Sequence, residues 1–233
     1  KEIPIYEFLT KFEPFSFEIK RVSTNETIFN TANFSFIYSD RYIEFSSPLP
    51  TNNIFGLGER VHGLKLKIPG IYTIWNKDLA AVIDDGIGGK NTYGMHPIYL
   101  MKEKSGKYHI VYLRNSNGMD VLLNKNDLDS NTITYKLVGG IIDLKFFLGE
   151  NSVEDLIKSY HKYLGGYTLQ PFWSFGFHQS RWGFKNLEAL KDVLSHYESN
   201  NLPLDGIWMD IDYMINKNIF TIDESNFNLL GLD

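Results

Sequence analysis

Polar and apolar residues alternate with a period of two over most of the first 150 residues. This alternation indicates strands with one buried face, and turn residues separate the segments. We therefore expect residues 1–150 to form an antiparallel β-sandwich. The turns are expected at 104–106, 115–118, 126–131 and 139–140. The expected strands are 15–22, 33–38, 41–46, 97–101, 108–113, 119–123, 132–138 and 141–148.

Residues 63–93 interrupt this pattern, because they are rich in glycine and poorly periodic. Long irregular loops in compact domains are usually functional or disordered. Trp75 and the apolar residues around it argue against disorder, so we expect an ordered loop that reaches toward another part of the protein. The glycine run at 84–89 opens no helix and lacks the Lys-Ser/Thr pair of a phosphate-binding loop.

Two later segments, 152–164 and 186–199, have apolar residues at helical spacing. Ser152 is the expected N-cap of the first helix, with Asp155 three residues later, and the glycines from Gly165 end it. We expect residues 151–170 to form a linking helix.

The second helix lies between the apolar runs 172–177 and 206–209, which predicts a βαβ unit with two parallel strands. Residues 216–221 could add another strand. A closed (β/α)₈ barrel needs about 250 residues. Residues 171–233 therefore predict only the beginning of a barrel, which would be unstable alone or completed by residues outside this chain.

Composition narrows the possible functions. The 233 residues carry a net charge of −5, which argues against nucleic-acid binding, and they include no cysteine. No apolar run reaches the roughly 18 residues of a membrane span, so we expect none in this segment. No group of His, Asp and Glu has the spacing of metal ligands, and we expect neither a metal nor a cofactor. The chain starts at Lys1 without an initiator Met, so we expect either that an upstream segment was removed or that this is a piece of a longer chain.

Charged and aromatic residues follow the two expected parallel strands, in the runs 178–182 and 210–212. In parallel sheets, functional residues collect at the carboxyl ends of strands. Residues 175–183 and 204–214 resemble the start of the catalytic barrel in glycoside hydrolase family 31. Within that family they are most similar to the α-glucosidases of the acid maltase, maltase-glucoamylase and sucrase-isomaltase type. Ser180 departs from that pattern, because relatives commonly have cysteine there. Four further motifs of this family occur in the same order, at 55–60, 74–78, 92–97 and 114–120.

The resemblance implies a multidomain protein: a galactose mutarotase-like sandwich followed by the first strands and helix of a TIM barrel. It implies hydrolysis of terminal α-linked glucose with retention, from a maltose-like oligosaccharide. Asp78, Trp182 and Asp210 match substrate-binding residues of the family. The family's nucleophile and acid/base lie on later barrel strands, downstream of Asp233, so no catalytic residue is expected here. The remainder of the barrel would be required for activity.

Each candidate residue also has a structural interpretation. Asp210 would equally suit a cap or an ion pair with Arg181, and Asp78 would suit a solvated loop. For Trp182, packing is the alternative to stacking on a sugar. We expect Asp212 to have a structural, ion-paired role and His178 to be hydrogen-bonded. Packing roles are expected for Trp173 and Trp208.

Two other hypotheses for the function of the whole chain stand beside the enzyme. It could be a non-catalytic carbohydrate-binding or interaction module from a truncated gene, or a purely structural sandwich. For location, we expect a lysosomal or secreted protein, with the endoplasmic reticulum as the alternative. Two glycosylation sequons at Asn25 and Asn33 fit a secretory route, although such triplets also arise by chance in an Asn-rich sequence.

Overall fold

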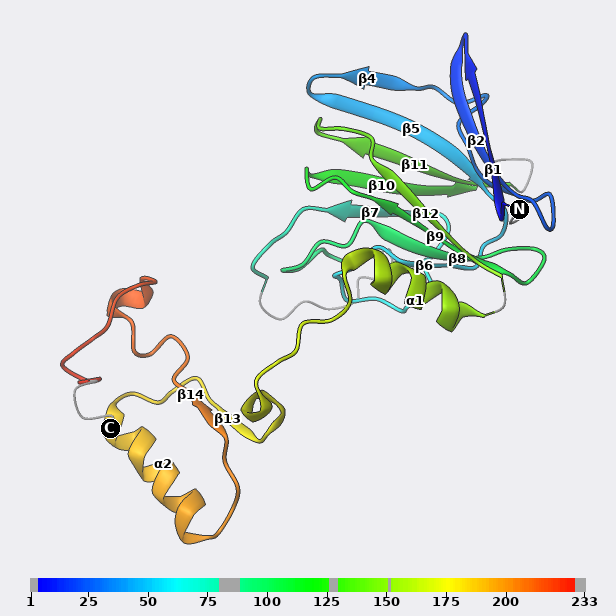
Figure 1. Cartoon of the computed structure of the whole chain (residues 1–233). Coiled ribbons are helices and arrows are strands. Elements are labelled where there is room, and N and C mark those ends of the chain that lie inside the picture. The colour runs from blue at the N-terminus through cyan, green and yellow to red at the C-terminus, as the bar shows by residue number, and fades with distance from the viewer. Residues whose placement is uncertain (1–3, 80–88, 126–129, 151, 229–233) are drawn as a thin grey trace. The chain divides into compact units, whose positions relative to one another are not determined.

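The computed structural model describes residues 4–79, 89–125, 130–150 and 152–228. The chain forms two compact units, Lys1–Gly166 and Tyr167–Asp233, and each is described by itself (Figure 1). Most of the expected glycine run at 84–89 and most of the expected turn at 126–131 lie outside the described residues.

The described strands of the first unit form three antiparallel sheets. The first contains, in spatial order, β1 (Tyr6–Phe12), β2 (Phe15–Arg21) and β3 (Thr27–Asn30). The second contains β4 (Ile37–Ser39), β5 (Tyr42–Leu49), β11 (Asn131–Leu137), β10 (Met119–Lys125) and β7 (Gly70–Ile74). The third contains β12 (Leu144–Gly149), β9 (Tyr108–Leu113), β8 (Ile98–Lys102) and β6 (Ile54–Gly56).

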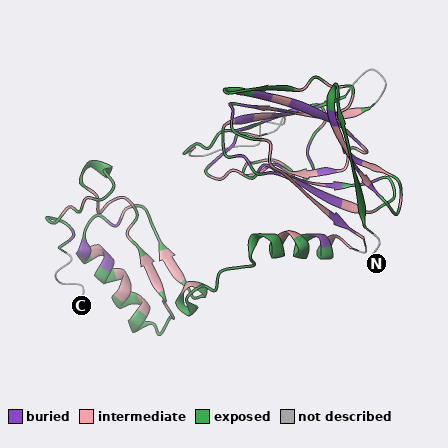
Figure 2. Cartoon of the chain, turned by 45° about the horizontal axis from the view of Figure 1, so that its top comes forward, coloured by how far each residue is buried: buried purple, intermediate pink, exposed green. Residues whose placement is uncertain are grey.

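One apolar core joins the three sheets, which confirms the predicted antiparallel sandwich. Alternate residues of each strand point inward, as Met119, Val121 and Leu123 of β10 illustrate. Across the β5–β11 ladder, Phe45 and Tyr135 are paired in register, and their rings stack with centroids 4.9 Å apart. In Figure 2 the buried residues line the space between the sheets, as the period-two pattern requires.

Several strand boundaries differ from the prediction. The strand expected at 33–38 begins only at Ile37, because a turn follows β3: the Ala32 N–H donates to Asn30 Oδ1 at 2.7 Å, and Asn33 has φ +67°. Strands β1, β3 and β6 were not predicted, and β7 falls inside the stretch expected to be irregular. The strand expected at 141–148 begins at Leu144.

Both predicted helices are present, and their caps explain where they start. Helix α1 (Val153–Leu164) begins after Ser152, whose hydroxyl accepts the Asp155 N–H at 3.1 Å. Gly165 ends it with φ +92°, a left-handed conformation that suits glycine. Helix α1 packs on β12 and β9 of the first unit. In the part of the chain that the structure describes, no helix combines the length and apolar character needed to cross a bilayer.

The second unit contains the predicted βαβ arrangement. Strands β13 (His178–Ser180) and β14 (Gly206–Trp208) pair in parallel, and helix α2 (Leu187–Ser199) connects them. A small core consists of Phe184, Leu190 and Phe227. This strand–helix–strand order is the one predicted for the beginning of a barrel.

Two apolar runs of this unit are not the strands expected from the sequence. The 3₁₀ turn η1 (Phe172–Phe175) occupies most of 172–177, because the Pro171 carbonyl accepts both the N–H and the hydroxyl of Ser174. Strand β13 therefore starts at His178. The expected strand 216–221 is instead the turn η2 (Ile215–Lys217) and a loop with positive φ at Phe220. Phe172 and Phe220 are 93% and 100% exposed within the described residues.

Candidate functional site

The parallel pairing of β13 and β14 brings Trp182 and Asp210 to the same edge of the second unit. Ser180 pairs with Trp208 as the last residues of the ladder. Trp182 and Asp210 each follow two residues beyond that pair, so they occupy equivalent positions at the carboxyl ends of the strands. This is the edge at which barrel enzymes place their functional residues.

The Asp210 backbone is left-handed, with φ +57°. Its Oδ1 accepts the N–H of Ile211 at 2.8 Å, a local bond that helps aspartate to adopt this conformation. The suggested ion pair with Arg181 is not found among the described residues, because the Arg181 guanidinium lies 5.6 Å from the Phe184 ring centroid. Asp210 is exposed, so its carboxylate can accept further hydrogen bonds.

The Trp182 ring is 65% exposed within the described residues. Lys217 Nζ lies 5.5 Å from the ring centroid, a distance that allows a cation–π contact. The Trp182 ring is therefore accessible and is not buried in the core of this unit. It occupies the position on its strand that is equivalent to the position of Asp210 on the other strand.

Asp212 has the structural role expected from the sequence. Its Oδ2 accepts the Gly183 N–H at 2.6 Å, and its Oδ1 pairs with Lys185 Nζ at 3.1 Å. Burial of the carboxyl tends to raise the pKa of Asp212, but these bonds outweigh burial and lower that pKa. Asp212 therefore stays ionised and connects the end of β14 to the turn that follows Trp182.

His178 is hydrogen-bonded on both ring nitrogens, as expected. Trp208 Nε1 donates to Nδ1 at 3.2 Å, which assigns the proton to Nε2, and Nε2 donates to the Trp173 carbonyl at 3.1 Å. The rings of Trp173 and Trp208 lie 5.7 and 6.0 Å from the His178 ring. Both tryptophans remain about half exposed in this unit, so the described residues bury only one side of them.

Asp78 lies in the first unit, on an exposed segment that follows β7. Tyr93 donates its hydroxyl to Asp78 Oδ1 at 2.9 Å. This hydrogen bond to an ionised carboxylate raises the pKa of Tyr93. The two residues belong to different sequence motifs, 74–78 and 92–97, so the fold brings these motifs together.

Glu59 adds the third motif, 55–60, to the same place. Its carboxylate accepts the Thr92 hydroxyl at 2.7 Å and the Gly94 N–H at 3.1 Å, and its carbonyl accepts the Thr92 N–H at 3.0 Å. Asn91 completes this arrangement, and no pattern in the sequence predicted its role. Its contacts are mostly with backbone groups, which leave no periodicity or charge pattern.

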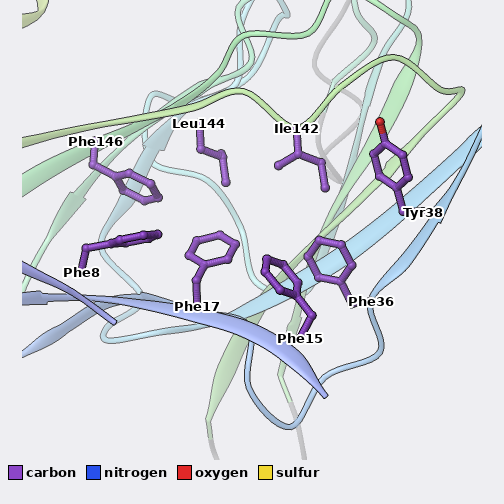
Figure 3. A pocket seen from close by; sticks show the side chains of 8 residues that line it. All are labelled: Phe8, Phe15, Phe17, Phe36, Tyr38, Ile142, Leu144 and Phe146. Carbon is purple, nitrogen blue, oxygen red and sulfur yellow. The ribbon is translucent and has the colours of Figure 1, made fainter. Parts of the chain in front are cut away.

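An apolar pocket of about 410 Å³ also lies in the first unit (Figure 3). Rings from β1 and β2, such as Phe8 and Phe17, face Leu144 and Phe146 of β12. No carboxylate lines this pocket, so it is chemically unsuited to a sugar. Among the residues that the structure describes, no three His, Cys, Asp or Glu side chains gather in a way that could hold a metal ion.

The fold and this edge define a class of two-part protein, in which a β-sandwich precedes a TIM barrel. Residues 167–230 match the model of the glycosyl hydrolases family 31 TIM-barrel domain. Over 93% of its length, the chain is 44% identical to the lysosomal acid alpha-glucosidase of Tetrahymena pyriformis, of which it covers 23%. Over 94% it is 38% identical to alpha-xylosidase 1 of Arabidopsis thaliana, of which it also covers 23%.

The chain is thus similar to glycosyl hydrolases family 31 in its barrel segment, and to an alpha-glucosidase over nearly its whole length. It also shares its fold with the crystal structure of the ER glucosidase II heterodimer. The two structures align with a TM-score of 0.79 at 22% sequence identity, and the alignment covers 98% of this chain and 30% of that one. The chain spans about a quarter of the length of the curated relatives it matches. Asp78 lies in one unit and Asp210 and Trp182 in the other, so their common pocket stays a prediction.

Proposed function

We propose that this chain supplies the substrate-binding part of a retaining, exo-acting α-glucosidase that releases terminal α-linked glucose from oligosaccharides. The observation that carries the proposal is the family 31 barrel match over 167–230, which contains Asp210 and Trp182 at the carboxyl ends of two parallel strands. The similarity to a lysosomal acid alpha-glucosidase over nearly the whole chain supports it.

Each proposed binding residue has the chemistry that a sugar requires. The exposed carboxylates of Asp78 and Asp210 can each accept hydrogen bonds from neighbouring hydroxyls, and such charge-assisted bonds are stronger than neutral ones. The exposed Trp182 ring offers a surface for the C–H face of a pyranose. These groups suit a hydroxyl-rich sugar ring as the substrate.

The nucleophile and the acid/base are proposed to lie on barrel strands outside this chain. A retaining glycosidase needs two carboxyl groups about 5 to 5.5 Å apart, and one of them needs a raised pKa. Asp212 is the neighbouring carboxylate of Asp210, but its hydrogen bond from Gly183 and its pair with Lys185 lower its pKa. Asp212 is therefore unsuited to be the proton donor.

Hydrolysis of p-nitrophenyl α-glucoside by the full-length gene product tests this proposal. Wild type should turn over the glucoside, and Asp210→Asn should lower kcat/KM by about tenfold to a hundredfold, because a lost bond to a charged group costs about 1.5–3 kcal/mol. Asp192→Asn, a change of the same chemistry on the exposed surface of α2, is the control and should leave kcat/KM unchanged. No turnover by wild type would refute the enzymatic function.

A second candidate substrate is a terminal α-xyloside, because the chain is 38% identical to alpha-xylosidase 1 over 94% of its length. Xylose lacks the hydroxymethyl group of glucose, so the two p-nitrophenyl glycosides differ in one substituent. We expect a larger kcat/KM for the glucoside. The opposite order would reassign the enzyme to xylosides.

For the cellular location we propose the lysosome, on the similarity to a lysosomal acid alpha-glucosidase. Fractionation of cells that express the tagged full-length product should place it with lysosomal markers. Co-migration with endoplasmic reticulum markers would favour the alternative.

A further inference from the structure

The side chain of Asn91 joins three segments that are distant in sequence. Its Oδ1 accepts the Trp75 N–H at 2.8 Å, and its Nδ2 donates to the carbonyls of Glu59 and Gly94 at 3.0 and 2.9 Å. Asn91 is only 5% exposed. These bonds link the three family motifs at 55–60, 74–78 and 92–97 through one buried amide.

Both N–H groups of this amide and one lone pair of its oxygen are used. Removing the amide would leave the Trp75 N–H without its acceptor, whereas the carbonyls of Glu59 and Gly94 would keep the N–H groups of Thr92 and Glu59 as donors. A buried N–H without a partner is costly, so the Trp75 segment would move to recover its hydrogen bond.

Two of the linked segments are connected to the Asp78 carboxylate, one through the chain and the other through a hydrogen bond. Trp75 lies three residues before Asp78, and the Lys77 N–H donates to the Thr92 carbonyl at 2.8 Å. On the other segment, Tyr93 donates to Asp78 at 2.9 Å. A shift of either segment would therefore change the position of the Asp78 carboxylate.

We propose that Asn91 is a positioning residue that holds Asp78 where it binds the substrate sugar. This inference rests on the proposed function of Asp78. Asn91 itself does not contact the substrate, and its effect on catalysis passes through Asp78. Because a displacement of about 1 Å can cost up to about a hundredfold in rate, Asn91→Ala should lower kcat/KM by about tenfold to a hundredfold.

Asn115 offers a matched control. It is 8% exposed, its Nδ2 donates to the carbonyls of Gly139 and Ile141 at 3.1 and 3.0 Å, and its Oδ1 accepts the Asn117 N–H at 2.8 Å. It thus makes the same kinds of backbone bonds as Asn91, but to a turn that does not include Asp78. Asn115→Ala should destabilise the sandwich comparably and leave kcat/KM within about threefold of wild type.

The experiment compares five versions of the full-length product on p-nitrophenyl α-glucoside: wild type, Asp78→Asn, Asn91→Ala, Asn115→Ala and the double variant Asp78→Asn/Asn91→Ala. If Asn91 acts through Asp78, the double variant should be no worse than Asp78→Asn by more than about twofold. Additive losses, or an equal loss for Asn115→Ala, would overturn the proposal. Asn91→Ser, which keeps a small polar group, takes the place of Asn91→Ala if that variant does not fold.

A crystal structure of the Asn91→Ala protein supplies a readout that does not depend on activity. The bond between Tyr93 and Asp78, 2.9 Å in wild type, should break. An unchanged Asp78 segment would overturn the positioning role. An inactive wild type would instead refute the proposed function, so the two failures are distinguishable.

Discussion

Replacing Glu103 by glutamine should destabilise the sandwich by about 3 kcal/mol at neutral pH. Glu103 is buried against Arg21: Arg21 Nε and Nη2 donate to its two oxygens at 2.8 and 2.6 Å, and both side chains are fully buried. His109 Nδ1 lies 3.0 Å from the same carboxylate, and burial lowers the pKa of His109, so its neutral ring donates this bond.

The pKa of Glu103 gives the magnitude of the expected loss of stability. Burial alone would raise this pKa, but the bonds from His109 and Arg21 outweigh burial and lower the pKa from 4.5 to about 2. One pKa unit corresponds to about 1.4 kcal/mol, so the folded state stabilises the ionised carboxylate by about 3 kcal/mol. Loss of one partner of a buried ion pair typically costs about 3–5 kcal/mol. Glu150 also pairs with Arg21, which favours the lower value.

The sign of the pH dependence follows from the lowered pKa. Because Glu103 ionises more readily in the folded state, its stabilisation is complete above about pH 4.5 and is lost as the pH falls toward 2. The stability difference between wild type and Glu103→Gln should therefore stay constant from pH 7 to pH 5 and shrink below that. A protein of an acidic compartment would keep this stabilisation.

Urea unfolding, followed by circular dichroism at pH 7, 5, 3 and 2, measures this difference. Asp155→Asn is the control, because Asp155 and Lys158 form an exposed pair at 3.4 Å that should contribute less than about 1 kcal/mol. Equal unfolding midpoints for wild type and Glu103→Gln at pH 7, or a difference that does not change between pH 5 and pH 2, would show that the ionised Glu103 carboxylate does not stabilise the sandwich.

Two further predictions concern the second unit. Gly176→Ala should destabilise the unit by about 1–3 kcal/mol, because the new methyl group would collide with Asp205, whose Cβ lies 2.6 Å from that position. Gly63→Ala is the control: Gly63 has open space around it, so this change should be neutral in the same unfolding experiment. Asp212→Ala should speed hydrogen exchange of the Gly183 amide about tenfold, whereas Asp212→Asn, which keeps an acceptor oxygen, should preserve its protection. Equal exchange rates in the two Asp212 variants would show that this bond does not hold the turn.

Much of the fold could be predicted where local rules and burial agree. The helix after Ser152 was predictable because its cap, its apolar face and Gly165 all indicate the same boundaries. The prediction of a strand at 172–177 was wrong, because this run of aromatic residues has the pattern of a buried strand. Pro171 and Gly176 instead favour a turn, and the aromatic side chains stay largely exposed in the described unit.

The site was predictable only in part. Asp78, Trp182 and Asp210 came from family motifs, and β13–β14 register explains why two of them share an edge. Asn91 was missed because a single buried asparagine has no sequence signature, and its hydrogen bonds are to backbone groups that only the fold brings together.

We propose that Asp78 and Asp210 bind the same sugar, and a crystal structure of the full-length gene product with bound glucose would show whether they do. Both carboxylates should lie within hydrogen-bonding distance of hydroxyls on one glucose, with the Trp182 ring beside it. Carboxylates on opposite sides of the protein, with no shared cavity between them, would contradict this proposal.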